Sequence, residues 1–268
     1  MEDDESIIDE FREPTRRDRR IKDSDYFSAW EGVFDAKTLE AIEYLKRKRI
    51  IEDIYWVVST GKEADVFYAK SPKGEEYAVK IYRIHTSRFK RKDIYVLGDR
   101  RFARGLSEIK EKWSWARREF KSLKIAWRYE IHVPRPITVY RNVVVMEFIG
   151  EDGTPAPLLK DVEEIEEPEK VFKVLIEDIN KLYNKAKLVH ADLSPFNILY
   201  HKGICWIIDM AQAVRTSHHY ALQFLYRDLY HLRNFFAAFI DELPTADELF
   251  KMITGREPDL IIKSYVEG

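Results

Sequence analysis

The sequence predicts an α+β fold of two lobes: an antiparallel β-rich lobe that contains one long helix, followed by a reduced helical lobe. Short segments rich in β-branched and aromatic residues gather between residues 54 and 149, as strands do. Beyond that point, apolar residues recur at helical spacing instead. The chain has 268 residues, 45% of them hydrophobic, which is enough for a sizeable core. We therefore divide the chain into residues 1–25, 26–149 and 150–268.

The first two parts combine a charged tail with helices and strands. Residues 1–25 are dense in charge and poor in apolar groups, which is typical of a flexible tail. Asp35 can cap an extra N-terminal amphipathic helix over residues 35–49. Residues 85–106 lack periodicity and are predicted to be a long flexible insertion, and the long helix follows over residues 107–129. Strands are expected at residues 54–59, 64–70, 76–84, 137–140 and 143–149.

The last part is mainly helical, with one short strand pair. Helices are expected at residues 168–187, 220–240 and 245–254. The segments FNILY and ICWIIDM lie between the first two helices and are short and apolar, as a strand pair would be. Pockets for nucleotides commonly lie between two lobes of this kind.

Composition limits the class of protein. A single cysteine, Cys205, excludes a disulfide within the chain and a zinc site made of several cysteines. There is no apolar run of 18 residues, and the N-terminus MEDDESIIDE is acidic and lacks the apolar stretch of a secretory signal. We therefore expect a soluble cytoplasmic protein with no membrane partner. Its oligomeric state is left open by the sequence.

The charges are unevenly distributed although the net charge is only −2. Residues 83–128 hold fifteen Lys and Arg against five Asp and Glu, whereas residues 150–170 hold eight acidic side chains against two basic ones. The simpler interpretation of such runs is a solvated helix face. The alternative is that the basic segment contacts phosphate groups of a nucleotide or an RNA.

The segment LVHADLSPFN carries the strongest chemical signal. Asp192 and Asn197 lie five residues apart on one predicted loop, and Asp209 follows at the end of an apolar strand. Asp192 can sit beside an attacking hydroxyl or water as a catalytic base. Asn197 and Asp209 offer the hard oxygen ligands that Mg²⁺ prefers, with nucleotide phosphates and water completing the shell. Each feature alone is often only turn chemistry, so the argument depends on their combination with the first lobe.

A lysine in the first lobe supplies the complementary charge. Lys80 lies in the middle of the apolar strand AVKI, where an ammonium group is costly unless it meets an anion. We expect it to bind the α- and β-phosphates of ATP and to pair with Glu119 from the long helix. The alternative is that Lys80 snorkels to solvent and Glu119 faces water.

Two further segments complete a candidate nucleotide site. A turn with one glycine joins the first two strands, and backbone N–H groups of such a turn can cradle phosphate, although an ordinary hairpin turn is as good an interpretation. The segment MEFIG leads out of the last apolar strand, where backbone groups can hydrogen-bond adenine. The candidate nucleotide-binding residues are Ser59, Thr60, Gly61, Lys62, Glu63, Ala64, Lys80, Glu119, Met146, Glu147 and Ile149.

Taken in order, these segments resemble the RIO family of atypical serine/threonine kinases. STGKEADVF, AVKIYRI, MEFIGED and LVHADLSPFNILY are similar to the signatures of the first RIO subgroup in its archaeal form. The resemblance covers roughly residues 50–235. It implies a two-lobed protein-kinase-like fold with a truncated helical C-lobe, ATP and Mg²⁺ as cofactors with Mn²⁺ as a substitute, and a role in small ribosomal subunit maturation. The immature subunit or its rRNA is the implied partner.

The resemblance also assigns roles to individual residues. Asp192 is the implied catalytic base, Asn197 and Asp209 the metal ligands, and Lys80 the phosphate anchor. Asp209 is further implied to accept the γ-phosphate as an aspartyl-phosphate, which gives ATPase turnover.

Several departures from ordinary protein kinases narrow the expected activity. Ala191 replaces the arginine of the H-R-D loop, so that a phosphorylated activation loop has no arginine to pair with there. Met210 and Ala211 follow Asp209 in place of Phe-Gly, and Ala211 also differs from the glycine expected in this RIO subgroup. Only 59 residues follow Asp209, too few for an activation segment and the peptide-binding helices of a full C-lobe. A broad peptide-kinase activity is therefore not expected.

Three alternatives remain open from the sequence. The H-x-D-x-x-x-x-N loop also occurs in small-molecule kinases and in a kinase of a tRNA-modifying complex. A non-catalytic ribosome-assembly factor switched by ATP would need the same nucleotide pocket. A plain RNA-binding protein would use the basic stretch alone.

Overall fold

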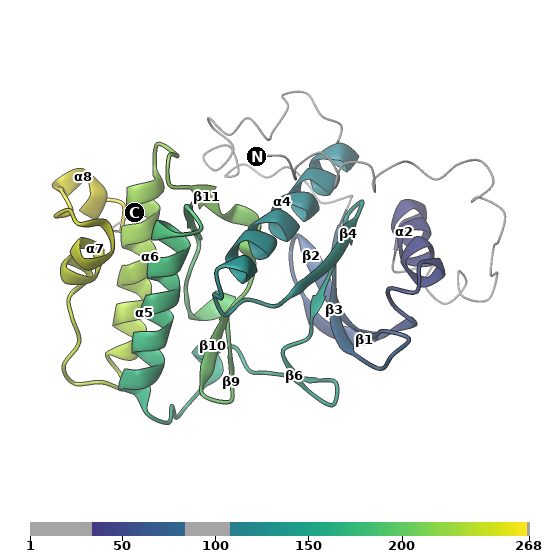
Figure 1. The fold of residues 1–268 in the computed structure, drawn as a ribbon, viewed down its shortest axis with the longest axis horizontal. Helices are drawn as coiled ribbons and strands as arrows, with labels where there is room; N and C mark the ends of the chain where they lie inside the picture. Colours follow the sequence, from purple (N-terminus) through teal and green to yellow (C-terminus); the bar gives the residue numbers. More distant parts are fainter. Residues whose placement is uncertain (1–33, 84–107, 267–268) are drawn as a thin grey trace.

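The structure is a computed structural model that describes residues 34–83 and 108–266. The predicted flexible tail at residues 1–25 and the predicted insertion at residues 85–106 lie outside these ranges. A mixed α and β chain forms two lobes side by side, one built on a sheet and one on helices (Figure 1). None of the helices in the described ranges is long and apolar enough to cross a membrane.

The N-terminal lobe is built on one antiparallel sheet of five strands in the order β1-β2-β3-β5-β4. Alternating apolar residues and the short connections at residues 61–63 and 71–75 predict hairpins, and the strands form where the pattern places them. The fifth predicted strand is shorter than expected, because it ends at Glu147. The bounds are β1 Asp53–Thr60, β2 Ala64–Lys70, β3 Glu76–Tyr82, β4 Pro136–Tyr140 and β5 Val143–Glu147.

Two helices cover opposite faces of this sheet (Figure 1). Helix α2 (Ala36–Arg47) is capped by Asp35, whose side chain accepts hydrogen bonds from the N–H groups of Lys37 and Thr38, as the sequence predicts. Helix α4 (Glu108–Arg128) is the predicted long helix. Successive residues of a strand point to opposite faces, so each strand serves two separate apolar cores.

The C-terminal lobe packs helices around short strand pairs. Helix α5 ends three residues before its predicted end and α6 ends four before. The two-residue pairs β6–β7 and β8–β11 and the four-residue helix α8 were not predicted, since they are too short to show periodicity. The helices are α5 Pro168–Asn184, α6 Ala221–Phe236, α7 Ala246–Thr254 and α8 Leu260–Lys263; the strands are β6 Gly150–Glu151, β7 Thr154–Pro155, β8 Leu188–Val189, β9 Ile198–His201, β10 Ile204–Ile207 and β11 Val214–Arg215.

Buried contacts tie the two lobes together. The buried guanidinium of Arg118 on α4 donates to the carbonyl oxygens of Gln212 (3.2 Å) and Ala213 (2.7 Å) in the C-terminal lobe. His132, in the loop after α4, lies 2.6 Å from the buried carboxylate of Asp178 on α5. These contacts fix the long helix relative to the segment around Asp209.

Candidate active site between the lobes

Side chains of β3 alternate between the two faces of the sheet, and this places Lys80 on the face that α4 covers. Val79 and Ile81 belong to the core under α2, whereas Tyr82 belongs to the core around α4. Lys80 lies between Val79 and Ile81 and therefore shares the α4 face with Tyr82. It is buried, with 9% of its surface exposed, so the ammonium group requires anionic partners.

Those partners come from both lobes. The Lys80 Nζ lies 2.8 Å from Glu119 Oε1 on α4 and 3.1 Å from Asp209 Oδ1 in the C-terminal lobe. The Tyr82 hydroxyl donates to the other oxygen of Glu119 at 2.5 Å. We call these four residues the lysine cluster. The interpretation that Lys80 and Glu119 face solvent is therefore wrong.

Charge and burial oppose each other in the lysine cluster. Burial alone would lower the pKa of Lys80, but the charges of Asp209 and Glu119 outweigh it and raise that pKa above its usual value. Burial raises the pKa of Glu119, and Lys80 counteracts the rise. Burial and the neighbouring Glu119 also raise the pKa of Tyr82. Lys80 consequently stays charged at neutral pH.

The segment between β8 and β9 forms a loop, residues 190–197, that presents Asp192 and Asn197. The Asn197 side-chain amide donates to the carbonyl oxygen of Asp192 at 2.7 Å and to its Oδ2 at 3.3 Å. Ala191 adopts a left-handed conformation with φ of 69°, which is uncommon for a residue with a side chain. Asp192 is exposed, so its carboxylate is accessible to a substrate.

His190 joins this loop to the segment that carries Asp209. It is buried, its Nδ1 accepts the backbone N–H of Asp192 at 3.3 Å, and its Nε2 lies 2.9 Å from the carbonyl oxygen of Ile208. This pattern requires the neutral ring with the proton on Nε2, and burial lowers the pKa of His190 accordingly. The Ile208 N–H in turn donates to the carbonyl oxygen of Asn197 at 3.0 Å. The backbones next to both predicted metal ligands are thus held together.

Asp209 lies beyond the strand rather than at its end. The prediction that it ends the strand is wrong, because β10 stops at Ile207. Asp209 takes a left-handed conformation with φ of 60° and ψ of 54°, which turns the chain away from the β9–β10 pair. This turn brings its carboxylate to Lys80.

Two residues of α6 that the sequence analysis did not identify form hydrogen bonds with the backbone of the 190–197 loop. Both oxygens of the buried Asp228 accept backbone N–H groups, from Ala191 at 2.9 Å and from Leu193 at 3.0 Å. Burial raises the pKa of Asp228 to about 8, while Arg227 and the two N–H donors oppose the rise. Arg227 donates to the carbonyl oxygen of Ala191 at 2.5 Å. The sequence signal that could have identified Asp228 is its position on the apolar face of a predicted helix, where a carboxylate is costly unless it has partners.

The same neighbours set the acidity of Asp192. Asp192 is exposed as a whole residue, but neighbouring groups partly desolvate its carboxyl group; this desolvation is the largest cause that raises its pKa, and the charge of Asp209 adds to it. His190 and Arg227 act in the opposite direction. A raised pKa brings a carboxylate closer to the range in which a general base works well at neutral pH.

The predicted phosphate-binding turn is a tight hairpin between β1 and β2. The Gly61 N–H donates to the carbonyl oxygen of Ala64 at 3.0 Å, and a Cβ at Gly61 would lie 2.9 Å from that oxygen. A side chain there would force the turn open. Ala64 pairs with Tyr82 across β2 and β3, and the Glu63 carbonyl oxygen accepts the N–H of Arg83 at 2.9 Å, which places the end of the turn beside Tyr82 of the lysine cluster. Ser59, Thr60, Gly61 and Lys62 are exposed, and Glu63 and Ala64 are half-buried.

The segment MEFIG lies on the connection between the lobes. The Glu147 N–H donates to the carbonyl oxygen of Arg135 and the Phe148 N–H to that of Glu76. The Ile149 carbonyl oxygen accepts from Ala156 at 3.0 Å, whereas its N–H makes no hydrogen bond within residues 34–83 and 108–266. Met146 is buried in the core that continues into the C-terminal lobe.

The donor set at Asn197 and Asp209 fits Mg²⁺. The Asn197 amide nitrogen is engaged by Asp192, which leaves its oxygen as the group available to a cation. The Asp209 side chain is 44% exposed and can add an anionic oxygen. No cluster of three His, Cys, Asp or Glu side chains that could hold a metal occurs in the described ranges. A site here would therefore depend on oxygens from nucleotide and water, as Mg²⁺ sites commonly do.

The structure thus brings together Lys80, Glu119 and Asp209 by direct contact, and joins Asp192 and Asn197 to them through His190 and Ile208.

The sequence and the fold are both similar to those of known kinases. Residues 65–249 match the RIO domain family. In fold, the chain is similar to the Rio2 kinase of Chaetomium thermophilum crystallised as an ADP/Mg²⁺-phosphoaspartate complex, with a TM-score of 0.63 and 20% identity over 90% of this chain and 78% of that one.

Relatives at higher identity come from both eukaryotes and archaea. The chain is 38% identical to the human serine/threonine-protein kinase RIO1 over 93% of its own length, but it covers 45% of that protein. It is 39% identical to the RIO-type serine/threonine-protein kinase Rio1 of Haloferax volcanii, over 93% of this chain and 83% of that one. A similar protein in Methanocaldococcus jannaschii is 38% identical over 88% and 80% of the two chains. The chain therefore belongs to the RIO family of atypical serine/threonine-protein kinases, and within it to the Rio1 subgroup.

Proposed function

We propose that the protein binds ATP with Mg²⁺, or with Mn²⁺, between its lobes and transfers the γ-phosphoryl group. The observation that carries this proposal is the lysine cluster, in which one buried ammonium contacts carboxylates of both lobes. Adenine would meet the backbone at Glu147 and the N–H of Ile149, with Met146 behind it. The phosphates would lie under residues 59–64 and against Lys80.

The chain's own residues divide the work of phosphoryl transfer. Glu119 and Tyr82 orient the Lys80 ammonium toward the phosphates, and Asn197 and Asp209 would hold the cation, which neutralises charge on the phosphate oxygens. Asp192 would hold the attacking hydroxyl or water and take its proton. Catalysis in this class consists mainly of positioning and electrostatic stabilisation.

We further propose that Asp209 is phosphorylated during turnover. An Asp209 oxygen would bond to the γ-phosphorus while the bond from that phosphorus to the oxygen bridging the β- and γ-phosphates breaks, and ADP leaves. Water would then hydrolyse the aspartyl-phosphate and regenerate the carboxylate. The phosphoaspartate of the Chaetomium thermophilum Rio2 complex supports this proposal.

Substitution of Asp192 and Lys80 tests the assignment. Asp192→Asn should lower ATP turnover by at least about two to three orders of magnitude, the scale for losing one essential polar group. Lys80→Ala should weaken productive use of ATP. Phosphate release with Mg²⁺-ATP is the measurement, and Asp241→Asn, an exposed carboxylate in the turn after α6, is the matched control. Near-normal turnover in Asp192→Asn would remove it from the reaction.

Radiolabelled ATP distinguishes turnover through a phosphorylated enzyme from a protein that binds ATP as a switch without hydrolysing it. After incubation with γ-labelled ATP, label on the protein should be released by hydroxylamine, because acyl phosphates react with it and phosphoserine does not. Protein that binds ATP but neither hydrolyses it nor takes up label, with or without immature small ribosomal subunits, would favour the non-catalytic assembly factor.

We propose the immature small ribosomal subunit, through its rRNA, as the partner, which would place the protein in the cytoplasm. One face of α4 supports this. Exposed Arg117, Lys121 and Arg128 and half-buried Lys124 follow at spacings of four and three residues, with exposed Trp127 beside them. Binding of a labelled rRNA fragment should weaken in the variant Lys121→Glu/Lys124→Glu and show a shallower salt dependence. Lys73→Glu, on an exposed turn, should bind normally.

A further inference from the structure

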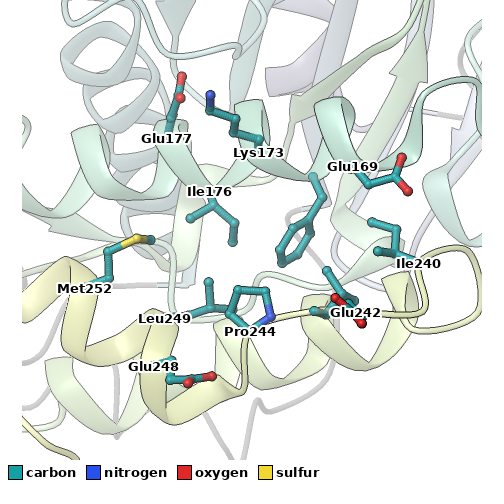
Figure 2. Close-up of a pocket in the computed structure, with 12 residues that line it drawn as sticks. Glu169, Lys173, Ile176, Glu177, Ile240, Glu242, Pro244, Glu248, Leu249 and Met252 are labelled. Atoms are coloured by element: carbon teal, nitrogen blue, oxygen red, sulfur yellow. The ribbon is translucent and has the colours of Figure 1, made fainter.

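An apolar groove lies in the C-terminal lobe, lined by residues other than those of the candidate active site. It runs between α5 and α7 and encloses about 690 Å³. Phe172 and Ile176 from α5 and Leu249 and Met252 from α7 line it, together with the connection before α7. Figure 2 shows Ile176, Leu249 and Pro244 gathered in the middle of the groove.

The floor of this groove is well packed. Phe172, Ile176 and Leu249 are each no more than 5% exposed, and the Phe172 ring lies 5.1 Å from that of Phe236 on α6. Met252, by contrast, is 62% exposed. A fixed apolar floor with an exposed methionine at its edge is suited to receiving apolar side chains of a partner, because methionine adapts its shape to them.

The rim of the groove is acidic. Glu169 and Glu177 on α5 lie on one side, and Glu242 and Glu248 lie on the other (Figure 2). Among the residues that the structure describes, Lys173 is the single basic side chain that lines the groove. Thr245 caps α7 and Glu248 completes the capping box; the hydrogen bonds that Glu248 accepts from the Thr245 N–H and hydroxyl lower its pKa, so it remains ionised. Four carboxylates against one ammonium leave a net negative rim around an apolar floor.

We propose that this groove is a docking site for a basic amphipathic helix of a partner protein. The lining helices offer no free strand edge, which excludes strand addition, whereas a third helix can pack its ridges between α5 and α7. An apolar stripe would contact Ile176, Leu249 and Met252, and lysines or arginines beside the stripe would meet the acidic rim. The length of α7, nine residues, corresponds to about 13 Å, so two to three turns of a partner helix would fill the groove.

A designed peptide tests the chemistry of this surface. The probe is an 18-residue fluorescent peptide of leucine and lysine, with the leucines at helical spacing on one face, titrated into the full chain and read by anisotropy. The same composition in scrambled order, without an apolar face, and a leucine–glutamate version of the helix should both bind at least about tenfold more weakly. Equal binding of either control would overturn the proposal.

Substitutions at exposed positions locate the binding. Met252→Asp and Glu169→Lys/Glu242→Lys should each weaken the leucine–lysine peptide by about tenfold or more. Leu260→Asp on α8 and Glu163→Lys, both exposed and outside the groove, should have no effect. ATP turnover should be unchanged in all four variants, so that this result is independent of the proposed function. Undiminished peptide binding, or a dimer of the full chain that Met252→Asp converts to a monomer, would overturn the proposal.

Discussion

The lysine cluster and the 190–197 loop lie side by side, but different forces hold them. In the lysine cluster, side chains from β3, α4 and the segment after β10 hold one another through opposite charges. In the loop, the buried side chains of His190 and Asp228 hold backbone groups. The carboxylate of Asp192 is thereby left accessible, whereas that of Glu119 is fully engaged.

This difference predicts which property, catalysis or stability, a substitution in each region should impair. Substitution of Asp209 in the lysine cluster removes charge that faces the proposed phosphates, so the loss should appear in catalysis. Substitution of Asp228 beneath the loop leaves buried N–H groups without acceptors, so the loss should appear in stability as well. Substitutions at four residues test and refine this division.

The largest effect is expected for Asp209→Asn. Asparagine removes the anionic oxygen proposed to meet the cation and the phosphorus, so ATP turnover should fall by at least about two to three orders of magnitude. The protein should remain folded, because Lys80 keeps its contact with Glu119 and the Asp209 side chain is 44% exposed. Phosphate release and a urea unfolding curve are the measurements. Turnover close to that of the unsubstituted protein would refute the role of Asp209.

Removal of Asp228 should affect stability first. Asp228→Ala leaves the N–H groups of Ala191 and Leu193 without acceptors, at a cost of roughly 2–6 kcal/mol for the two. Asp228→Asn keeps one acceptor oxygen and should cost about half as much. Urea unfolding measures both, and turnover of the folded Asp228→Asn protein should fall because the loop shifts. If Asp228→Ala unfolds at the same urea concentration as the unsubstituted protein, the loop does not depend on this carboxylate.

The two regions also differ in how well the sequence predicts them. The strand around Lys80 and the helix around Glu119 follow from local alternation and periodicity, so their pairing could be anticipated. Asp228 is 36 residues from Asp192 in a helix whose other buried positions are apolar, such as Leu225, Leu229 and Leu232. Only its charge on an apolar stripe distinguishes it, and the pattern does not say which backbone groups it meets.

The same limit applies to the remaining contacts between the lobes. Arg118 and Asp178 are also charged residues on buried helix faces, and their partners lie in loops whose path depends on the whole fold. The end of the strand before Asp209 was predicted two residues too late for a related reason. The apolar run WII continues the strand pattern, and the left-handed turn after it depends on tertiary contacts rather than on local sequence.

Tyr82→Phe should have a smaller effect than either aspartate. The substitution removes the hydroxyl that donates to Glu119 at 2.5 Å and leaves Lys80 in place. A buried carboxylate oxygen that loses one donor should destabilise the protein by about 1–3 kcal/mol, with a modest fall in ATP turnover. Tyr77→Phe is the matched control, since that hydroxyl donates to Glu75 at the far end of β3. Equal unfolding curves for Tyr82→Phe and the unsubstituted protein would show that Lys80 alone holds Glu119.

The smallest effect, on the pH profile rather than on the maximal rate, is expected for Arg227→Gln. The positive charge of Arg227 lowers the pKa of Asp192 against the rise caused by burial. Without it, that pKa rises further, so the carboxyl group becomes protonated at a higher pH as the solution is acidified. The acid limb of kcat/KM should therefore move to higher pH in Arg227→Gln. Arg227→Lys keeps the charge and should leave the limb in place, even though both variants alter the hydrogen bond to Ala191. A limb that stays fixed in Arg227→Gln, or that moves equally in both variants, would mean that the charge of Arg227 does not set the ionisation of Asp192.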